Sequence, residues 1–385
     1  MLPARYVDDS DNVWLLDEHE SAVTSVILAI PTVRWPRERY AAYDLTAELW
    51  AYGIQGRLWD LGRALPVHAY GTPDVVGVIV EAGLNDRPWL VNTLRQLSCK
   101  PLAGAAVPEK IRDAAVARVY RASSETSALS TWSSASHRYS ITIEERVTAI
   151  ETSEFSEIQR IIDEHSKIFV AVGKGVEKPD GVRSLAPHSS RRSEEDVELP
   201  TEDAVSIAHS RSAALAQVAI VTPGVLMNSF RKADFHIFWT LMREREGVFY
   251  RLTRSRGGLI YSIAAFNREY HEGGFGMCVV SCAPAQIASV VQSAKDAVEC
   301  ISSGDTSPAL LNNAAELVSM GRSLAMRNPL AVAKALLASE LSMVPPGDYS
   351  AQLATVSRRS VAATAQMTVH EPGWRIRVTL PGDPE

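Results

Sequence analysis

The feature of this sequence that most constrains its fold is an order of elements that occurs twice, once in each half. An apolar, β-rich run closed by proline lies at residues 22–31 (AVTSVILAIP) and again at 214–223 (ALAQVAIVTP). A helical segment follows each run, RERYAAYDLTAELWAYG in the first half and FHIFWTLMREREGVFYRL in the second. Because proline cannot donate to a sheet ladder, each run is predicted to be a strand that ends there.

Two extended runs and a further helix follow in each half. The predicted hairpin turns are Thr72-Pro73-Asp74 in the first half and residues 271–274 (HEGG) in the second. The helices that follow are DRPWLVNTLRQL and PAQIASVVQSAKDAVECI, and the second carries apolar residues at helical spacing. The order strand, helix, hairpin, helix occurs in both halves of the sequence. This repeat predicts an α+β fold of two tandem homologous domains. Each domain is expected to be a mainly antiparallel sheet with helices packed on one face.

A polar segment of mixed charge separates the two halves. Residues 188–203 read HSSRRSEEDVELPTED, and this composition is typical of a linker. We therefore expect one domain over residues 1–187 and a second over residues 204–385.

Composition excludes several classes of protein. With 46% hydrophobic and 22% charged residues, the chain is expected to be globular and not disordered. Its 39 Lys and Arg against 45 Asp and Glu give no basic excess, so no nucleic-acid partner is expected. The sequence has no apolar run of about 18 residues and no secretory signal at its start, so we expect no membrane partner and a cytoplasmic location.

The common catalytic motifs are missing from the sequence. It contains no phosphate-binding glycine loop and no G-x-S-x-G elbow. Its nine histidines are scattered, and none has a second histidine within two helical turns. An enzyme of unrelated chemistry stays open as a reading, but the lack of any clustered His, Cys or acidic constellation counts against it.

One segment of the second half carries a specific signal. Residues 251–266 (RLTRSRGGLIYSIAAF) resemble the pitrilysin/insulinase family of zinc peptidases, the inverzincins, which includes the mitochondrial processing peptidases. That family carries roughly L-R-E-x-x-G-L-x-Y-S in its second domain. The residues that match are Arg254, Gly258, Leu259, Tyr261 and Ser262. Two positions depart from the pattern, since Ser255 stands in place of the glutamate and the leucine is displaced to Leu252.

The resemblance also implies a zinc-binding H-x-x-E-H helix in the first domain, with its glutamate as the general base. At the matching place Tyr43 and Ala47 stand where the histidines belong, and Thr46 stands where the base belongs. The alignment can slip by one residue, but no histidine lies between His19 and His68. These side chains cannot replace two imidazoles and a carboxylate. We therefore expect no metal site and no cofactor in this chain.

In the family, the arginine and tyrosine of the second domain donate hydrogen bonds to the scissile carbonyl. The resemblance therefore implies that Arg254 and Tyr261 stabilise the tetrahedral intermediate, while Gly258, Leu259 and Ser262 contact the substrate. It implies a heterodimer or higher heteromer with a homologous subunit that bears H-x-x-E-H and binds zinc. This chain would close the peptide chamber and would be inactive alone.

Two other readings stay open. The chain can be a catalytically dead scaffold or a peptide-binding subunit of the same family. Locally, Arg254 is also explained by the preference of basic residues for a last helical turn, and Tyr261 by the preference of tyrosine for strands. No residue in the sequence identifies the peptide that is cut.

Overall fold

The structure is a computed structural model. It describes residues 3–7, 12–17, 21–33, 35–83, 87–98, 100, 102, 104–122, 139–174, 176, 178, 183–186, 188, 204–210, 214–257, 260–370 and 374–382. The chain divides into two units. Unit 1 comprises Met1–Ser127, Ile141–Arg191 and Ser323–Pro346, and unit 2 comprises Ala128–Ser140, Arg192–Arg322 and Gly347–Glu385. The predicted linker falls almost wholly outside the described residues.

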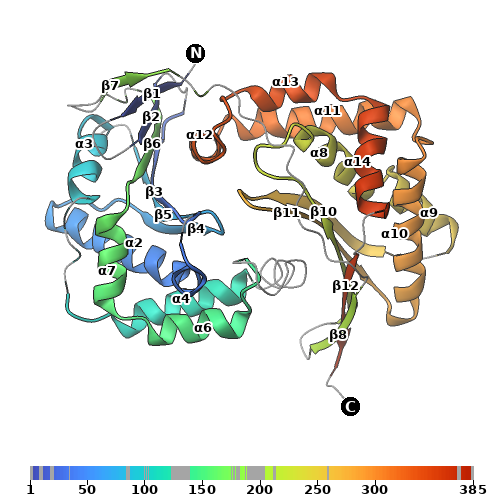
Figure 1. Cartoon of the computed structure of the whole chain (residues 1–385), viewed down its shortest axis with the longest axis horizontal. Coiled ribbons are helices and arrows are strands. Elements are labelled where there is room, and N and C mark those ends of the chain that lie inside the picture. The colour runs from blue at the N-terminus through green and yellow to red at the C-terminus, as the bar shows by residue number, and fades with distance from the viewer. Residues whose placement is uncertain are drawn as a thin grey trace. The chain divides into compact units, whose positions relative to one another are not determined.

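Unit 1 is built on a seven-stranded sheet with the order β4-β5-β3-β6-β2-β1-β7 (Figure 1). Its strands are β1 (Ala4–Val7), β2 (Asn12–Leu16), β3 (Thr24–Pro31), β4 (Val67–Thr72), β5 (Val75–Ala82), β6 (Ile168–Val172) and β7 (Arg183–Leu185). All neighbouring strands are antiparallel except β2 and β6. Within the described residues β4 has β5 as its one neighbour, so β4 is an edge strand.

Helices pack on both faces of this sheet. Those from the first half of the chain are α1 (Arg37–Ala41), α2 (Tyr43–Asp60), α3 (Arg87–Ser98), α4 (Glu109–Arg121), α6 (Ile143–Thr152) and α7 (Phe155–Glu164). Helix α2 contacts β4 and β5, and α4 contacts α2. The later helix α12 (Pro329–Ser342) contacts β3 and β6 (Figure 1). Strand β3 is buried on both faces as a result, apart from its last residue.

Unit 2 repeats the same topology with five strands in the order β10-β11-β9-β12-β8. They are β8 (Ala204–Ser210), β9 (Ala216–Pro223), β10 (Ile260–Glu269), β11 (Gly274–Cys282) and β12 (Arg375–Pro381). The parallel pair β12–β8 corresponds to β6–β2 in unit 1, and the hairpin β10–β11 corresponds to β4–β5. The predicted fold class of two mainly antiparallel sheets with packed helices is therefore confirmed. The expectation that helices cover one face of each sheet is wrong for unit 1, where α12 packs on the second face.

The helices of unit 2 cover an apolar core around β9 and β11. They are α8 (Lys232–Arg243), α9 (Val248–Ser255), the 3-10 turn η2 (Pro284–Gln286), α10 (Ile287–Ser302), α11 (Pro308–Ala325), α13 (Asp348–Thr355) and α14 (Arg358–His370). Among the core side chains are Phe235, Phe238, Trp239, Phe249 and Val290. Where one helical segment was expected in each half, the structure has two, interrupted at Ala42 in unit 1 and at residues 244–247 in unit 2.

The domain boundaries differ from the expected ones in two respects. Tyr139 and Ser140, which were expected in the first domain, belong to unit 2. Residues 323–346, which were assigned to the second domain, pack in unit 1. Val332, Leu336 and Leu337 of α12 lie in one apolar cluster with Ile27 of β3 and Val170 of β6. Such contacts join residues about 150 to 300 positions apart in the sequence, and no local pattern reports them.

Candidate functional site

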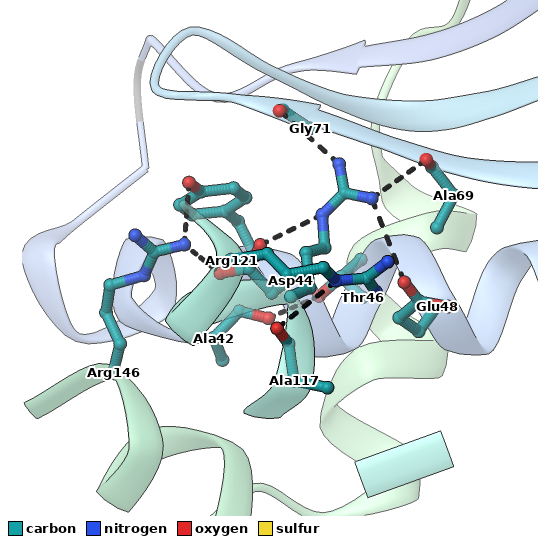
Figure 2. Close-up of polar contacts among 11 residues, drawn as sticks. Ala42, Asp44, Thr46, Glu48, Ala69, Gly71, Ala117, Arg121 and Arg146 are labelled. Carbon is teal, nitrogen blue, oxygen red and sulfur yellow. Dashed lines mark hydrogen bonds and ion pairs between the residues drawn. The ribbon is translucent and has the colours of Figure 1, made fainter. Parts of the chain in front are cut away.

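The degenerate zinc motif lies in the first half of α2, and its three positions are buried. Tyr43 is 6% exposed, while Thr46 and Ala47 are 0% exposed. The Thr46 hydroxyl donates to the backbone oxygen of Ala42 at 3.2 Å, so it is satisfied within the helix (Figure 2). Gly71 of β4 makes room for Tyr43, because a Cβ at Gly71 would lie 3.0 Å from two carbons of the tyrosine ring. These positions have become part of the packing between α2 and β4.

A buried ion network surrounds these positions (Figure 2). Asp44 of α2 is 1% exposed and accepts hydrogen bonds from two arginines, Arg118 of α4 at 3.2 Å and Arg146 of α6. Arg146 also donates to the hydroxyl of Tyr43 at 2.8 Å, and its guanidinium lies 4.7 Å from the centre of that ring. The network ties three helices of unit 1 together at the place where the resemblance implies a zinc site.

The electrostatics of this network favour charged arginines. Burial acts to lower the pKa of Arg146, but the neighbouring Tyr43 and Asp44 outweigh it and raise that pKa above its usual value. Glu48 lies one helical turn beyond Asp44, and its nearest carboxylate oxygen is 3.8 Å from Arg118. Burial raises the pKa of Glu48, and Arg118 opposes that rise. Two guanidinium groups therefore supply the positive charge around α2.

This site does not fit a zinc ion. Zinc in proteins is held by imidazole, thiolate and carboxylate ligands, and none of Tyr43, Thr46 and Ala47 offers one. The one carboxylate among the neighbouring buried residues, Asp44, is already bound by Arg118 and Arg146, and their two positive charges repel a divalent cation. In the part of the chain that the structure describes, no group of three or more His, Cys, Asp or Glu is arranged to hold a metal ion.

The arginine and tyrosine of the second-half motif are exposed in unit 2. Arg254 lies in the last turn of α9, and its guanidinium is 5.8 Å from the ring centre of Tyr250. Tyr261 is 61% exposed near the start of β10. The ladder between β10 and β11 shifts register between Ile260 and Ser262, so Tyr261 sits at a bulge. Bulges re-aim side chains and are common beside active sites.

The remaining predicted substrate contacts divide into two groups. Ser262 is exposed, and its hydroxyl donates to the hydroxyl of Ser281 on β11 at 2.8 Å. Gly258 and Leu259 lie outside the described residues. Arg254 therefore lies at the end of α9, and Tyr261 and Ser262 lie near the start of β10, on either side of the α9–β10 connection. Tyr43, Thr46 and Ala47 lie together on α2.

The sequence did not reveal the ion network, although part of a signal was present. Asp44 is a charged residue in a helix whose other residues are mostly apolar, and such a residue needs a partner when the helix packs. Its partners Arg118 and Arg146 follow 74 and 102 residues later in the chain. Sequence spacing along one helix could not identify them.

Comparisons with known proteins identify what this chain is similar to. Residues 152–318 match the model of the peptidase M16 inactive domain, a stretch that contains Arg254 and Tyr261. A comparison with curated proteins gives no match. Within the residues that the structure describes, no helix is both long and apolar enough to cross a membrane.

Several solved structures share the fold of the whole chain at low sequence identity. A protease from Helicobacter pylori is 12% identical with a TM-score of 0.73, over 99% of this chain and 100% of that one. A peptidase M16 inactive domain from Pseudomonas fluorescens is 11% identical with a TM-score of 0.73, over 100% of both chains. A chain of complex III2 from Candida albicans is 11% identical with a TM-score of 0.73, over 98% of this chain and 95% of that one.

At these identities the solved structures establish the fold. The resemblance to pitrilysin and insulinase peptidases is confirmed, because residues 152–318 match the M16 peptidase family in its inactive domain and the chain as a whole has the two-domain M16 fold.

Proposed function

We propose that this chain is the non-metal subunit of a heteromeric zinc peptidase. A homologous partner with an intact H-x-x-E-H helix holds the zinc and activates water, and this chain closes the peptide chamber. The observation that carries the proposal is the contrast between the two motifs. Tyr43, Thr46 and Ala47 are buried beside two arginines, whereas Arg254 and Tyr261 are exposed.

Exposure matters because these two side chains must reach a substrate held by another polypeptide. As hydroxide attacks a peptide carbonyl, negative charge develops on the oxygen, and donors fixed in place stabilise it most at that moment. A guanidinium offers a forked set of donors and a phenol offers one, so Arg254 and Tyr261 together suit an oxyanion. The M16 inactive-domain match over residues 152–318 supports a role without a metal of its own.

The proposal is tested by co-purifying the chain with a candidate H-x-x-E-H subunit and measuring peptide cleavage. Arg254→Met and Tyr261→Phe should each lower kcat by about a hundredfold, the usual cost of losing one oxyanion donor. The complex should stay assembled in size-exclusion chromatography, and the zinc content of the partner should not change. The chain alone should cleave nothing.

Arg251→Met is the matched control. Arg251 lies on the same helix as Arg254 and makes an exposed ion pair with Glu246 at 3.3 Å. Such surface pairs contribute little, so this variant should keep the wild-type rate. If both Arg254→Met and Tyr261→Phe retain full turnover, the catalytic role is rejected.

The second candidate function is a scaffold subunit. It is supported by the similarity to a chain of complex III2 from Candida albicans, a multi-subunit assembly. In that case the chain assembles with its partner, and neither Arg254→Met nor Tyr261→Phe changes any activity of the assembly. The same purification therefore separates the two functions.

A further inference from the structure

Arg118 of α4 donates hydrogen bonds both to α2 and to the edge strand β4. Its guanidinium donates to Asp44 at 3.2 Å, to the backbone oxygen of Ala69 at 2.9 Å and to that of Gly71 at 3.5 Å. A carboxylate oxygen of Glu48 lies 3.8 Å from the same group. Four oxygens from two elements therefore surround one cation that α4 supplies.

Within the described residues, the two backbone oxygens belong to an edge of the sheet where no strand other than β5 pairs with β4. In an antiparallel pair, alternate residues of a strand turn their C=O and N–H groups toward the partner strand or away from it. Ala69 and Gly71 are two residues apart, so their carbonyls point to the same side of β4. Both carbonyls accept hydrogen bonds from Arg118, so they lie on the side of β4 that faces away from β5. Strand β5 pairs with the other side of β4 along residues 67–72.

A strand added to β4 needs those same carbonyls. An added strand lies about 4.8 Å from its neighbour, and its N–H groups approach the carbonyl oxygens to about 2.9 Å. The guanidinium nitrogen bound to Ala69 already sits at 2.9 Å. An incoming peptide backbone and the Arg118 side chain therefore compete for one place.

The charges around Arg118 hold it there. Asp44 is 2% exposed at its side chain and Glu48 is 19% exposed, whereas Arg118 is 23% exposed. Arg146 neutralises Asp44 from the other side, and Arg121, one turn beyond Arg118 on α4, donates to the backbone oxygen of Ala117 on its own helix at 3.3 Å. Removing the Arg118 guanidinium leaves Glu48 and the two carbonyls without this donor.

We propose that Arg118 is an internal plug: its guanidinium fills an oxygen-lined cation site between α2 and β4 and prevents an extended peptide from adding to the free edge of β4. The ligand class that the plug excludes is an unstructured peptide bound by strand addition. The inference rests on contacts within unit 1 alone. It needs neither a partner subunit nor a role for Arg254 and Tyr261, so it can fail or hold independently of the proposed function.

The test is peptide binding by the full chain alone, measured by fluorescence anisotropy with a labelled, unstructured peptide of the length of β4. Arg118→Met keeps a long side chain but removes the donors, and it should bind the peptide about tenfold more tightly than the wild type, as regained main-chain hydrogen bonds predict. Added guanidinium ion, at concentrations that leave the fold intact, should reverse the gain. Hydrogen exchange in the bound variant should slow at residues 67–72.

Arg121→Met is the matched control, because it removes from the same helix a guanidinium whose hydrogen bond goes to the backbone oxygen of Ala117 on that helix. It should bind the peptide as weakly as the wild type. A folded Arg118→Met variant without tighter binding, or with a gain that guanidinium does not reverse, rejects the plug. If Arg118→Met does not fold, Arg118→Lys replaces it in the test. The single ammonium of lysine cannot bridge both carbonyls, so one of them becomes available to a peptide. Tighter peptide binding by Arg118→Lys then supports the plug, and unchanged binding rejects it.

Discussion

Thr46 and Ala47 have no exposed surface, and Asp44 beside them is bound by Arg118 and Arg146. At the scale of single residues, the positions of α2 that match the zinc motif therefore lie in a tightly packed apolar environment beside a fixed set of ion pairs. Cores of this kind tolerate little added volume, and they penalise a charge without a partner. Restoring zinc ligands by substitution therefore meets two separate obstacles.

The first prediction follows at this scale. The combined substitution Tyr43→His, Thr46→Glu and Ala47→His should bind no zinc, as measured by metal analysis of the purified protein. It should also lower the free energy of unfolding in urea by about 3 kcal/mol or more, because Thr46→Glu and Ala47→His enlarge two buried side chains and Thr46→Glu also buries a carboxylate.

Tyr43→Phe is the control for this experiment. It removes only the hydroxyl that accepts from Arg146, and it should cost about 1 kcal/mol. Stoichiometric zinc in the triple variant would show that the arginines do not exclude the metal.

At the scale of elements, a second, half-buried cluster joins α8, β10 and α13 in unit 2. Glu269 at the end of β10 accepts from Lys232 and His236 of α8, each at 3.0 Å, and the other ring nitrogen of His236 contacts the hydroxyl of Tyr349 on α13. Burial acts to raise the pKa of Glu269, but Lys232 and His236 outweigh burial and lower that pKa to about 2. The ionised carboxylate therefore stabilises the folded state.

The pH dependence follows from this lowered pKa. The stabilisation is fully present above the ordinary glutamate pKa of 4.5, and it is lost as the pH falls from 4.5 toward about 2. Glu269→Gln should lower the free energy of unfolding at pH 7 by about 2–3 kcal/mol, and its difference from the wild type should shrink toward zero near pH 2. Urea unfolding across this pH range measures both.

Glu246→Gln serves as the control, because the Glu246 side chain is 80% exposed in its pair with Arg251. It should change stability by less than about 0.5 kcal/mol at any pH. A difference between Glu269→Gln and the wild type that does not depend on pH would contradict the assignment of the stabilisation to the ionised carboxylate.

The elements also show what the sequence could and could not predict. Apolar runs ending at Pro31 and Pro223 predicted β3 and β9 correctly, and the turn at residues 72–74 predicted the β4–β5 hairpin. Arg254 and Tyr261 were expected at a helix end and a strand start, and they lie there. These signals are local. The Asp44 network and the packing of α12 depend on partners far apart in sequence, and periodicity within one segment carries no information about them.

At the scale of the whole molecule, each unit has its own apolar core, and unit 1 completes its core with α12 from late in the chain. Glu340 of the same helix accepts hydrogen bonds from Arg5 at 3.0 and 2.9 Å and from Trp14 at 2.6 Å. Burial acts to raise the pKa of Glu340, but its bonds to Arg5, Trp14 and His188 outweigh burial and lower that pKa. Helix α12 therefore belongs energetically to unit 1.

This arrangement predicts which unit responds to a change in α12. Leu336 is 4% exposed, so Leu336→Ala should lower the free energy of unfolding of unit 1 by about 2–5 kcal/mol. Native-state hydrogen exchange should speed up in β3 and β6 and not in β9 and β11. Faster exchange in both sheets alike would mean that the two units unfold as one.

The late position of α12 also affects how the protein is made. A ribosome adds residues in order at about 5–20 per second, so the strands of unit 1 leave the exit tunnel well before residues 329–342 are synthesised. Until then Ile27, Val170 and their neighbours have no helix over them. Unit 1 cannot reach its final packing during translation of the first half of the chain, and the nascent sheet keeps an apolar face exposed until α12 is made.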